Sequence, residues 1–146
     1  KSLTAIAIAA HEVGHAIQDQ QGDKRLATRT KLVPIVEKVG RWSVAIISLS
    51  PVIGIITRHP MPFSLLLFIG LSGFIARMMM HALTLPIEFD ASFSKALPLL
   101  REGNYVSLSN EKAVSRILKA ASLTYVSAAL ADILNIGRWM VIILRR

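Results

Sequence analysis

Two uncharged apolar runs separated by a short break constrain the fold of this chain most strongly. They cover residues 42–57 and 63–76, and the sequence "RHPMP" lies between them. A helix that crosses a bilayer needs ~20 apolar residues, and residues 78–85 extend the second run beyond Arg77. Two prolines in the break end any helix there. We therefore expect a transmembrane helical hairpin over residues 42–85, with a re-entrant or buried hairpin as the alternative.

A third apolar segment, residues 120–144, is also long enough to cross a bilayer. Hydrophobic residues make up 53% of the chain, above the roughly 45–50% that is usual for soluble domains. The chain has no cysteine, which excludes disulfides and thiolate metal sites. Any transition-metal site must then use histidine, aspartate and glutamate.

The net charge of +8 is distributed unevenly. Basic residues precede the hairpin and the final apolar segment, whereas the hairpin tip carries only Arg58. The positive-inside rule then places residues 1–41 and 88–119 on the cytoplasmic side, although Arg145 and Arg146 would lie on the far side. Because these basic residues flank apolar segments and lack interleaved aromatics, we expect a membrane partner and no nucleic acid.

Residues 3–21 read as a helix that contains the sequence "HEVGH". His11 and His15 are four residues apart, so they share a helix face and can bind one ion. Glu12 is turned by ~100° from His11, which suits a general base acting on a water beside the metal. Gly14 permits close approach of another element or of substrate. A chance match to this pentapeptide occurs about once in several hundred chains of this size.

A catalytic zinc takes three protein ligands, and the extended form "HxxGxxH" is absent here. Two antiparallel spans return the chain to its starting side, which makes Glu88 the best third ligand. Its alternative role is that of an ordinary charged residue at the membrane interface. Asp90 is the second choice, either as a ligand or as an acceptor for a ligand imidazole. His81, seven residues before Glu88, could line the site, but such a histidine is more often packed or interfacial.

Two charges within the apolar segments are expected to pair. Arg77 lies eleven residues before Glu88, and Asp132 lies twelve residues after Ala120. If Glu88 and Ala120 are level, the two charges lie at similar depth, and an ionisable residue in a span is usually paired. The alternative is that Arg77 extends to the interface and Asp132 faces a polar cavity.

Glycine, proline and serine residues predict where the helices begin and end. Gly22 suits the position just after the first helix. Pro34 is expected in the first turn of a separate helix lying at the membrane surface. Pro86 should kink the second hairpin helix or mark a restart, and Ser109 resembles the N-cap of a later helix.

Three stretches together are far more specific than the pentapeptide: "AIAIAAHEVGHAIQ", "TLPIEFDAS" and "AASLTYVSAAL". They resemble the YugP-type bacterial membrane zinc metallopeptidases, and the resemblance covers residues 3 to about 130. It implies a membrane-embedded peptidase with Zn²⁺ bound by His11, His15 and Glu88, and with Glu12 as the catalytic base. Members of this family carry a further N-terminal region with a membrane helix. Either such a region precedes this chain or the chain is a short member.

The predicted fold is an all-α membrane protein with a zincin-like metal-binding helix, a transmembrane hairpin and a C-terminal transmembrane helix. We expect residues 1–146 to form a single domain. Its parts are the metal-binding and interfacial helices (1–41), the hairpin (42–85), the third-ligand and cytoplasmic helices (86–119) and the C-terminal span (120–144).

The predicted function is that of a membrane-bound zinc metalloendopeptidase, which hydrolyses protein or peptide substrates at the cytoplasmic face of the bacterial inner membrane. One alternative is an intramembrane metalloprotease, and another is a catalytically incomplete zinc-binding scaffold. Glu12 argues against the scaffold, because a structural metal site needs no base. Tyr105, Tyr125 and Arg101 have suitable chemistry to stabilise an oxyanion. The oligomeric state stays open.

Overall fold

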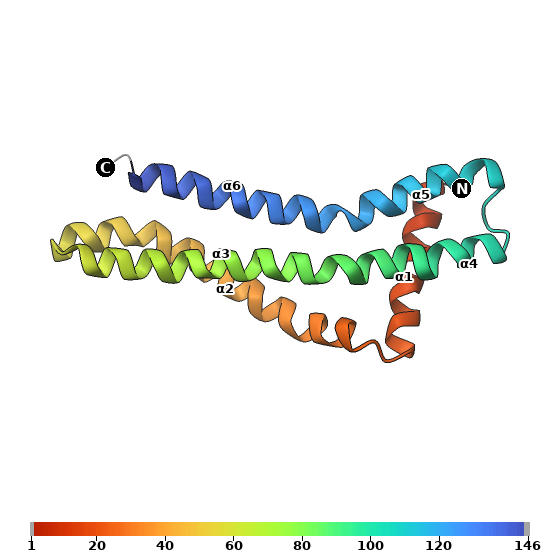
Figure 1. Ribbon diagram of the computed structural model, residues 1–146, viewed down its shortest axis with the longest axis horizontal. Helices are drawn as coiled ribbons and strands as arrows, with labels where there is room; N and C mark the ends of the chain where they lie inside the picture. Colours follow the sequence, from red (N-terminus) through yellow and green to blue (C-terminus); the bar gives the residue numbers. More distant parts are fainter. Residues whose placement is uncertain (1, 145–146) are drawn as a thin grey trace. The chain divides into compact units, whose positions relative to one another are not determined.

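The computed structural model describes residues 2–144, with side chains up to residue 141. Within that range the chain forms helices and no strand, so the all-α prediction is confirmed. The elements in order are α1 (Leu3–Gln20), α2 (Lys24–Thr57), α3 (Pro60–Phe89), the π-helix η1 (Asp90–Ala96), α4 (Leu97–Glu102), α5 (Leu108–Ser122) and α6 (Thr124–Leu144) (Figure 1).

The chain divides into two compact units. The first unit contains the chain up to residue 30 and residues 82–127, and the second contains residues 31–81 and the chain from residue 128 on. Helices α2, α3 and α6 each contribute residues to both units. The assignment of all these segments to a single domain stays a prediction.

Three helical stretches are long and apolar enough to cross a membrane: Lys24–Thr57, Pro60–Glu102 and Leu108–Val141. They overlap the three transmembrane segments expected from the sequence. The last predicted segment began at residue 120, but α5 continues to Ser122 and α6 starts at Thr124.

In the second unit, α2 and α3 form the predicted hairpin, with Arg58 in the turn at a positive φ of 49° (Figure 1). Small or branched side chains such as Ser43 and Ile47 are buried. In contrast, Trp42 and Phe68 are 71% and 73% exposed. Small residues inside and large apolar residues outside are expected of helices that pack together in lipid.

Helix α2 corrects the prediction of a separate surface helix with Pro34 in its first turn. It runs unbroken over residues 24–57, with Pro34 and Pro51 in its interior. A proline lacks the N–H that a helix needs, and another donor must satisfy the carbonyl four residues earlier. For Pro51 that carbonyl belongs to Ile47, and the Ser50 hydroxyl donates to it at 2.8 Å. At Pro51 this local side-chain hydrogen bond lets the helix continue.

Other boundaries agree only in part with the sequence. Gly22 has a φ of 68° just after α1, as predicted. Helix α3 passes through Pro86 without a restart, and the helix type changes only at Asp90. The N-cap of α5 is Ser107, not Ser109, because Ser107 has the extended backbone that an N-cap requires.

The core of the first unit lies between α1 and the elements that follow α3. In Figure 1, α1 lies across the segment in which α3 passes into α4, and beside α5. The buried core residues are Ala7, Ala10, Ala96, Leu100, Val114 and Leu118. Alanines on α1 and η1 allow these helices to pack closely, and each larger buried side chain contributes ~1.5–3 kcal/mol.

Candidate metal centre

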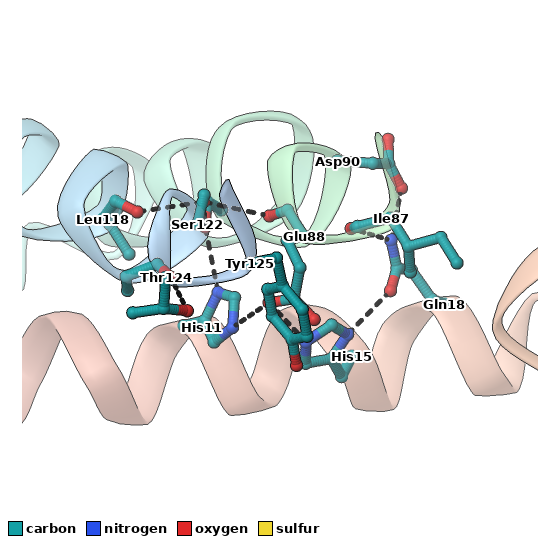
Figure 2. A network of polar contacts seen from close by, with 12 residues as sticks. His11, His15, Gln18, Ile87, Glu88, Asp90, Leu118, Ser122, Thr124 and Tyr125 are labelled. Atoms are coloured by element: carbon teal, nitrogen blue, oxygen red, sulfur yellow. Dashed lines mark hydrogen bonds and ion pairs between the residues drawn. The ribbon is translucent and has the colours of Figure 1, made fainter. Parts of the chain in front are cut away.

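Helix α1 presents two histidines to a glutamate in the last turn of α3 (Figure 2). The Nε2 atoms of His11 and His15 lie 3.1 and 3.5 Å from the same Oε2 atom of Glu88. One ligand atom from each residue can be chosen so that all three lie within 4.8 Å of one another. The structure therefore brings together the three side chains that the sequence singled out as metal ligands.

Gly14 allows this approach. A Cβ atom at Gly14 would overlap the backbone carbonyl of Ala91, which is fully buried at the start of η1. The sequence prediction that this glycine admits another element is therefore confirmed. The π-helix begins two residues after Glu88. Such wide turns are rare in proteins as a whole, but those that occur are often found at functional sites.

A chain of hydroxyls fixes the imidazole of His11. Its Nδ1 lies 2.9 Å from the Ser92 hydroxyl, which lies 2.8 Å from the Ser122 hydroxyl. Ser122 in turn donates to the Leu118 carbonyl at 2.9 Å. A carbonyl only accepts, so all these contacts are satisfied together when each group donates toward Leu118. In this arrangement His11 carries a proton on Nδ1, and its Nε2 faces Glu88.

The amide of Gln18 fixes the second imidazole in the same way. Its nitrogen donates to the Ile87 carbonyl at 3.0 Å and to the Asp90 carboxylate at 2.7 Å. The amide oxygen must therefore accept from Nδ1 of His15, at 2.9 Å. Asp90 thus reaches His15 only through Gln18 and lies outside the group of three converging side chains.

This donor set fits a divalent metal ion. With both Nδ1 protons donated outward, neutral His11 and His15 point their Nε2 lone pairs at the Glu88 carboxylate. Three Lewis bases converge only if protons or a cation lie between them. Indeed, the hydrogen bond to Glu88 raises the pKa of His15, against the opposing effect of burial. Two imidazoles and one carboxylate form a known zinc ligand set that leaves one coordination position open.

Arg29 binds the other oxygen of Glu88. Its guanidinium lies 3.0 Å from Oε1, so the two carboxylate oxygens have different partners. The same guanidinium donates to the Tyr125 hydroxyl at 2.5 Å, and its carbon lies 5.5 Å from the centre of the Tyr125 ring. Since Oε1 is held by Arg29, Glu88 is arranged to offer a metal only Oε2.

Two predicted site residues are not part of this group. Glu12 is exposed on α1, and its role as the base stays a prediction. His81 belongs to the second unit, where its Nε2 lies 3.6 Å from Oδ2 of Asp132. Its predicted role in lining the site also stays a prediction.

The expected pair within the apolar segments is confirmed. Arg77 lies 3.3 Å from Oδ1 of Asp132, which is buried. A Cβ atom at Gly40 would overlap the side chain of Arg77, so this glycine provides space for the long arginine.

Sequence reasoning missed the residues that support the three converging side chains. Gln18 follows His15 by three residues and Ser92 follows Glu88 by four, and such spacing places them on the same helix faces. This signal was available. Arg29, in contrast, is one of many basic residues before the hairpin, and nothing in the sequence distinguishes it.

Comparisons with known proteins show which family this chain belongs to. The family described as "Putative neutral zinc metallopeptidase" matches residues 1–144. The "Putative membrane protease YugP" of Bacillus subtilis (strain 168) is 32% identical over 144 residues, which are 99% of this chain and 60% of that protein. The chain thus spans about 60% of the length of this curated relative. No solved structure matches the chain.

Proposed function

This chain belongs to the family of putative neutral zinc metallopeptidases, and from that premise we propose that it is a membrane-bound, zinc-dependent endopeptidase. One observation carries the proposal: the Nε2 atoms of His11 and His15 converge on Oε2 of Glu88, at 3.1 and 3.5 Å. The fixed tautomers of both imidazoles leave these nitrogens available to a metal.

Different residues of the chain have different roles in hydrolysis. A zinc ion held by His11, His15 and Glu88 would lower the pKa of a water molecule and polarise the substrate carbonyl. Glu12 accepts the proton of the attacking water and donates it to the leaving amine when the C–N bond breaks. Its exposure on α1 lets it meet both water and substrate. Gln18 and Ser92 keep the imidazoles oriented throughout.

We place this reaction at the cytoplasmic face of the inner membrane rather than within the bilayer. The basic residues before the hairpin and the final span favour that side. Helix α1 is not among the candidate spans found in the described part of the chain, which supports a site at the interface. The relative's name, a membrane protease, supports the membrane location.

The test combines metal analysis with proteolysis of an unfolded soluble protein by the purified chain in detergent. Glu12→Gln should keep zinc and lose activity by about 10²–10⁴-fold, since it removes only the base. Glu37→Gln, which changes an exposed glutamate of α2, is the matched control and should behave as wild type. Unchanged proteolysis by Glu12→Gln, or proteolysis that survives zinc removal by a chelator, would refute the proposal.

A further inference from the structure

Peptide hydrolysis at this site needs a donor for the negative charge that forms on the substrate carbonyl oxygen. Resting on the function proposed above, we propose that the hydroxyl of Tyr125 is this donor and that Arg29 is its positioning residue. The sequence left three candidates of suitable chemistry, and the structure separates them.

Two of the three candidates have surroundings unlike those of the converging ligands. Tyr105 lies between α4 and α5 and is 67% exposed. Arg101, on α4, is ion-paired with Glu111. Arg101 and Glu111 line a cavity of about 400 Å³ between α4 and α5, and its described lining includes none of the three converging ligands. Neither candidate contacts His11, His15 or Glu88 through any described hydrogen bond or ion pair.

Tyr125 is connected directly to the ligand group. It lies in the first turn of α6, and its hydroxyl is directed toward α1, the helix that carries both histidines (Figure 2). Arg29 bridges the hydroxyl and Oε1 of Glu88, at 2.5 and 3.0 Å. A single side chain, that of Arg29, therefore connects the phenol to one of the proposed metal ligands.

The direction of these hydrogen bonds makes the phenol a donor toward the site. A guanidinium has no acceptor, so the phenol oxygen accepts from Arg29, and its single O–H donates away from Arg29. A hydroxyl that accepts from a cation is also a stronger donor, because linked hydrogen bonds polarise one another.

The role in the reaction is electrostatic. As the water oxygen bonds to the carbonyl carbon, the carbonyl π pair moves onto the carbonyl oxygen. The Tyr125 O–H donates to this oxygen and keeps its proton. When the C–N bond breaks, the pair returns to re-form the carbonyl, and the hydroxyl is released. One donor of this kind contributes about 10²–10³ in kcat.

The chain offers a matched pair of variants, since Tyr105 and Tyr125 are its two tyrosines. Tyr125→Phe keeps the ring and removes the donor. It should lower kcat by about 10²–10³-fold, with KM changed less than about threefold and the zinc content unchanged. Tyr105→Phe should match wild type in all three measurements. Wild-type kcat in Tyr125→Phe would overturn the proposal, and so would loss of zinc from it, which would show a role in metal binding.

A binding measurement separates this proposal from the proposed peptidase function. The probe is a phosphoramidate dipeptide, whose tetrahedral anionic group resembles the developing oxyanion, titrated into zinc-saturated protein by calorimetry. Tyr125→Phe should weaken its binding by about 10–100-fold, as for loss of one hydrogen bond to a charged group. This loss in a chain that cleaves no peptide would sustain the anion-binding role of Tyr125 while the peptidase function failed. Equal affinity in both proteins would overturn the role of Tyr125.

The role of Arg29 is tested on the same zinc-saturated proteins. Arg29→Lys keeps the charge, but its ammonium lies on a shorter side chain than the Nη2 atom of Arg29, which reaches both partners. We expect phosphoramidate binding to weaken by about tenfold in Arg29→Lys and further in Arg29→Ala, so the conservative variant rescues part of the loss. Wild-type affinity in Arg29→Ala would contradict the positioning role.

Discussion

The two units each contain a buried carboxylate beside an arginine and histidine, but the two clusters are built differently. In the first unit, Glu88 gives one oxygen to Arg29 and the other to two imidazoles, those of His11 and His15. In the second unit, Asp132 has Arg77 at one oxygen and a single imidazole, that of His81, at the other.

The difference lies in what surrounds the imidazoles of the first unit. His11 and His15 are one helical turn apart, and each donates its Nδ1 proton to a partner on the far side, Ser92 or Gln18. Their Nε2 lone pairs therefore point to where a cation belongs. In the second unit the carboxylate has one imidazole beside it, that of His81, and its pairing with an arginine is expected of an ionisable residue in an apolar span. A carboxylate, an arginine and a histidine alone do not indicate a metal site.

The largest contrast between the two clusters should appear in zinc affinity. Glu88→Gln removes the one charged ligand of the three and should weaken zinc binding by more than ~10²-fold, beyond the 10–100-fold typical of supporting residues. The parallel change in the other cluster, Asp132→Asn, should leave zinc affinity within about twofold of wild type. Competition with a chelator of known affinity measures both. Equal losses in the two variants would show that the clusters do not differ as described.

The second contrast concerns two helical glycines. Gly14→Ala places a Cβ atom against the Ala91 carbonyl, and because backbone cannot rotate away, we expect destabilisation near ~3 kcal/mol. Gly137, in α6, has open space around the corresponding position, so Gly137→Ala should be neutral or stabilising by up to ~1 kcal/mol. Denaturation in detergent, followed by circular dichroism, gives both values. A Gly14→Ala protein as stable as wild type would mean that α1 and η1 need not lie this close.

The third contrast concerns the partners of the imidazoles. Ser92→Ala and Gln18→Ala should each weaken zinc binding by about 10–100-fold, because the imidazole loses the acceptor that fixes its tautomer. Ser48→Ala is the control, since the Ser48 hydroxyl donates only to the Val44 carbonyl of its own helix turn. The same chelator competition measures all three. Full zinc affinity in both site variants would show that the imidazoles orient without these hydrogen bonds.

The sequence predicted the ligands better than it predicted their support. The histidine spacing and the return of the chain through a hairpin were sufficient to select Glu88, because both follow from helix geometry and topology. The pairing of Arg77 with Asp132 was likewise predictable, because the two residues lie at similar depth in the apolar segments. Arg29 was not predictable, because its contact with Glu88 depends on how α2 packs in the first unit, and its sequence neighbours are equally basic.

Helix boundaries were the least predictable part of the fold. Pro34 was expected to start a helix and instead lies inside α2, and Pro86 lies inside α3. Local rules assume that a carbonyl freed by proline has no other donor. Ser50, which donates to the carbonyl freed by Pro51, shows how the folded chain supplies one. The π-helix after Glu88 has no simple sequence signal, since its residues would also fit an ordinary α-helix.

The smallest expected effect sharpens the description of the second cluster as a charge-balanced pair. A double-mutant cycle with Arg77→Met and Asp132→Asn should give a coupling of about 0.6–1.7 kcal/mol, the range found for polar contacts between helices in lipid. Each single variant leaves one charge without its main partner. The double variant should therefore lose less stability than the sum of the two single losses. Steric trapping or unfolding in mixed micelles measures the four proteins. Strict additivity would mean that Asp132 relies on His81 rather than Arg77, and a cycle with His81→Phe in place of Arg77→Met would then carry the coupling.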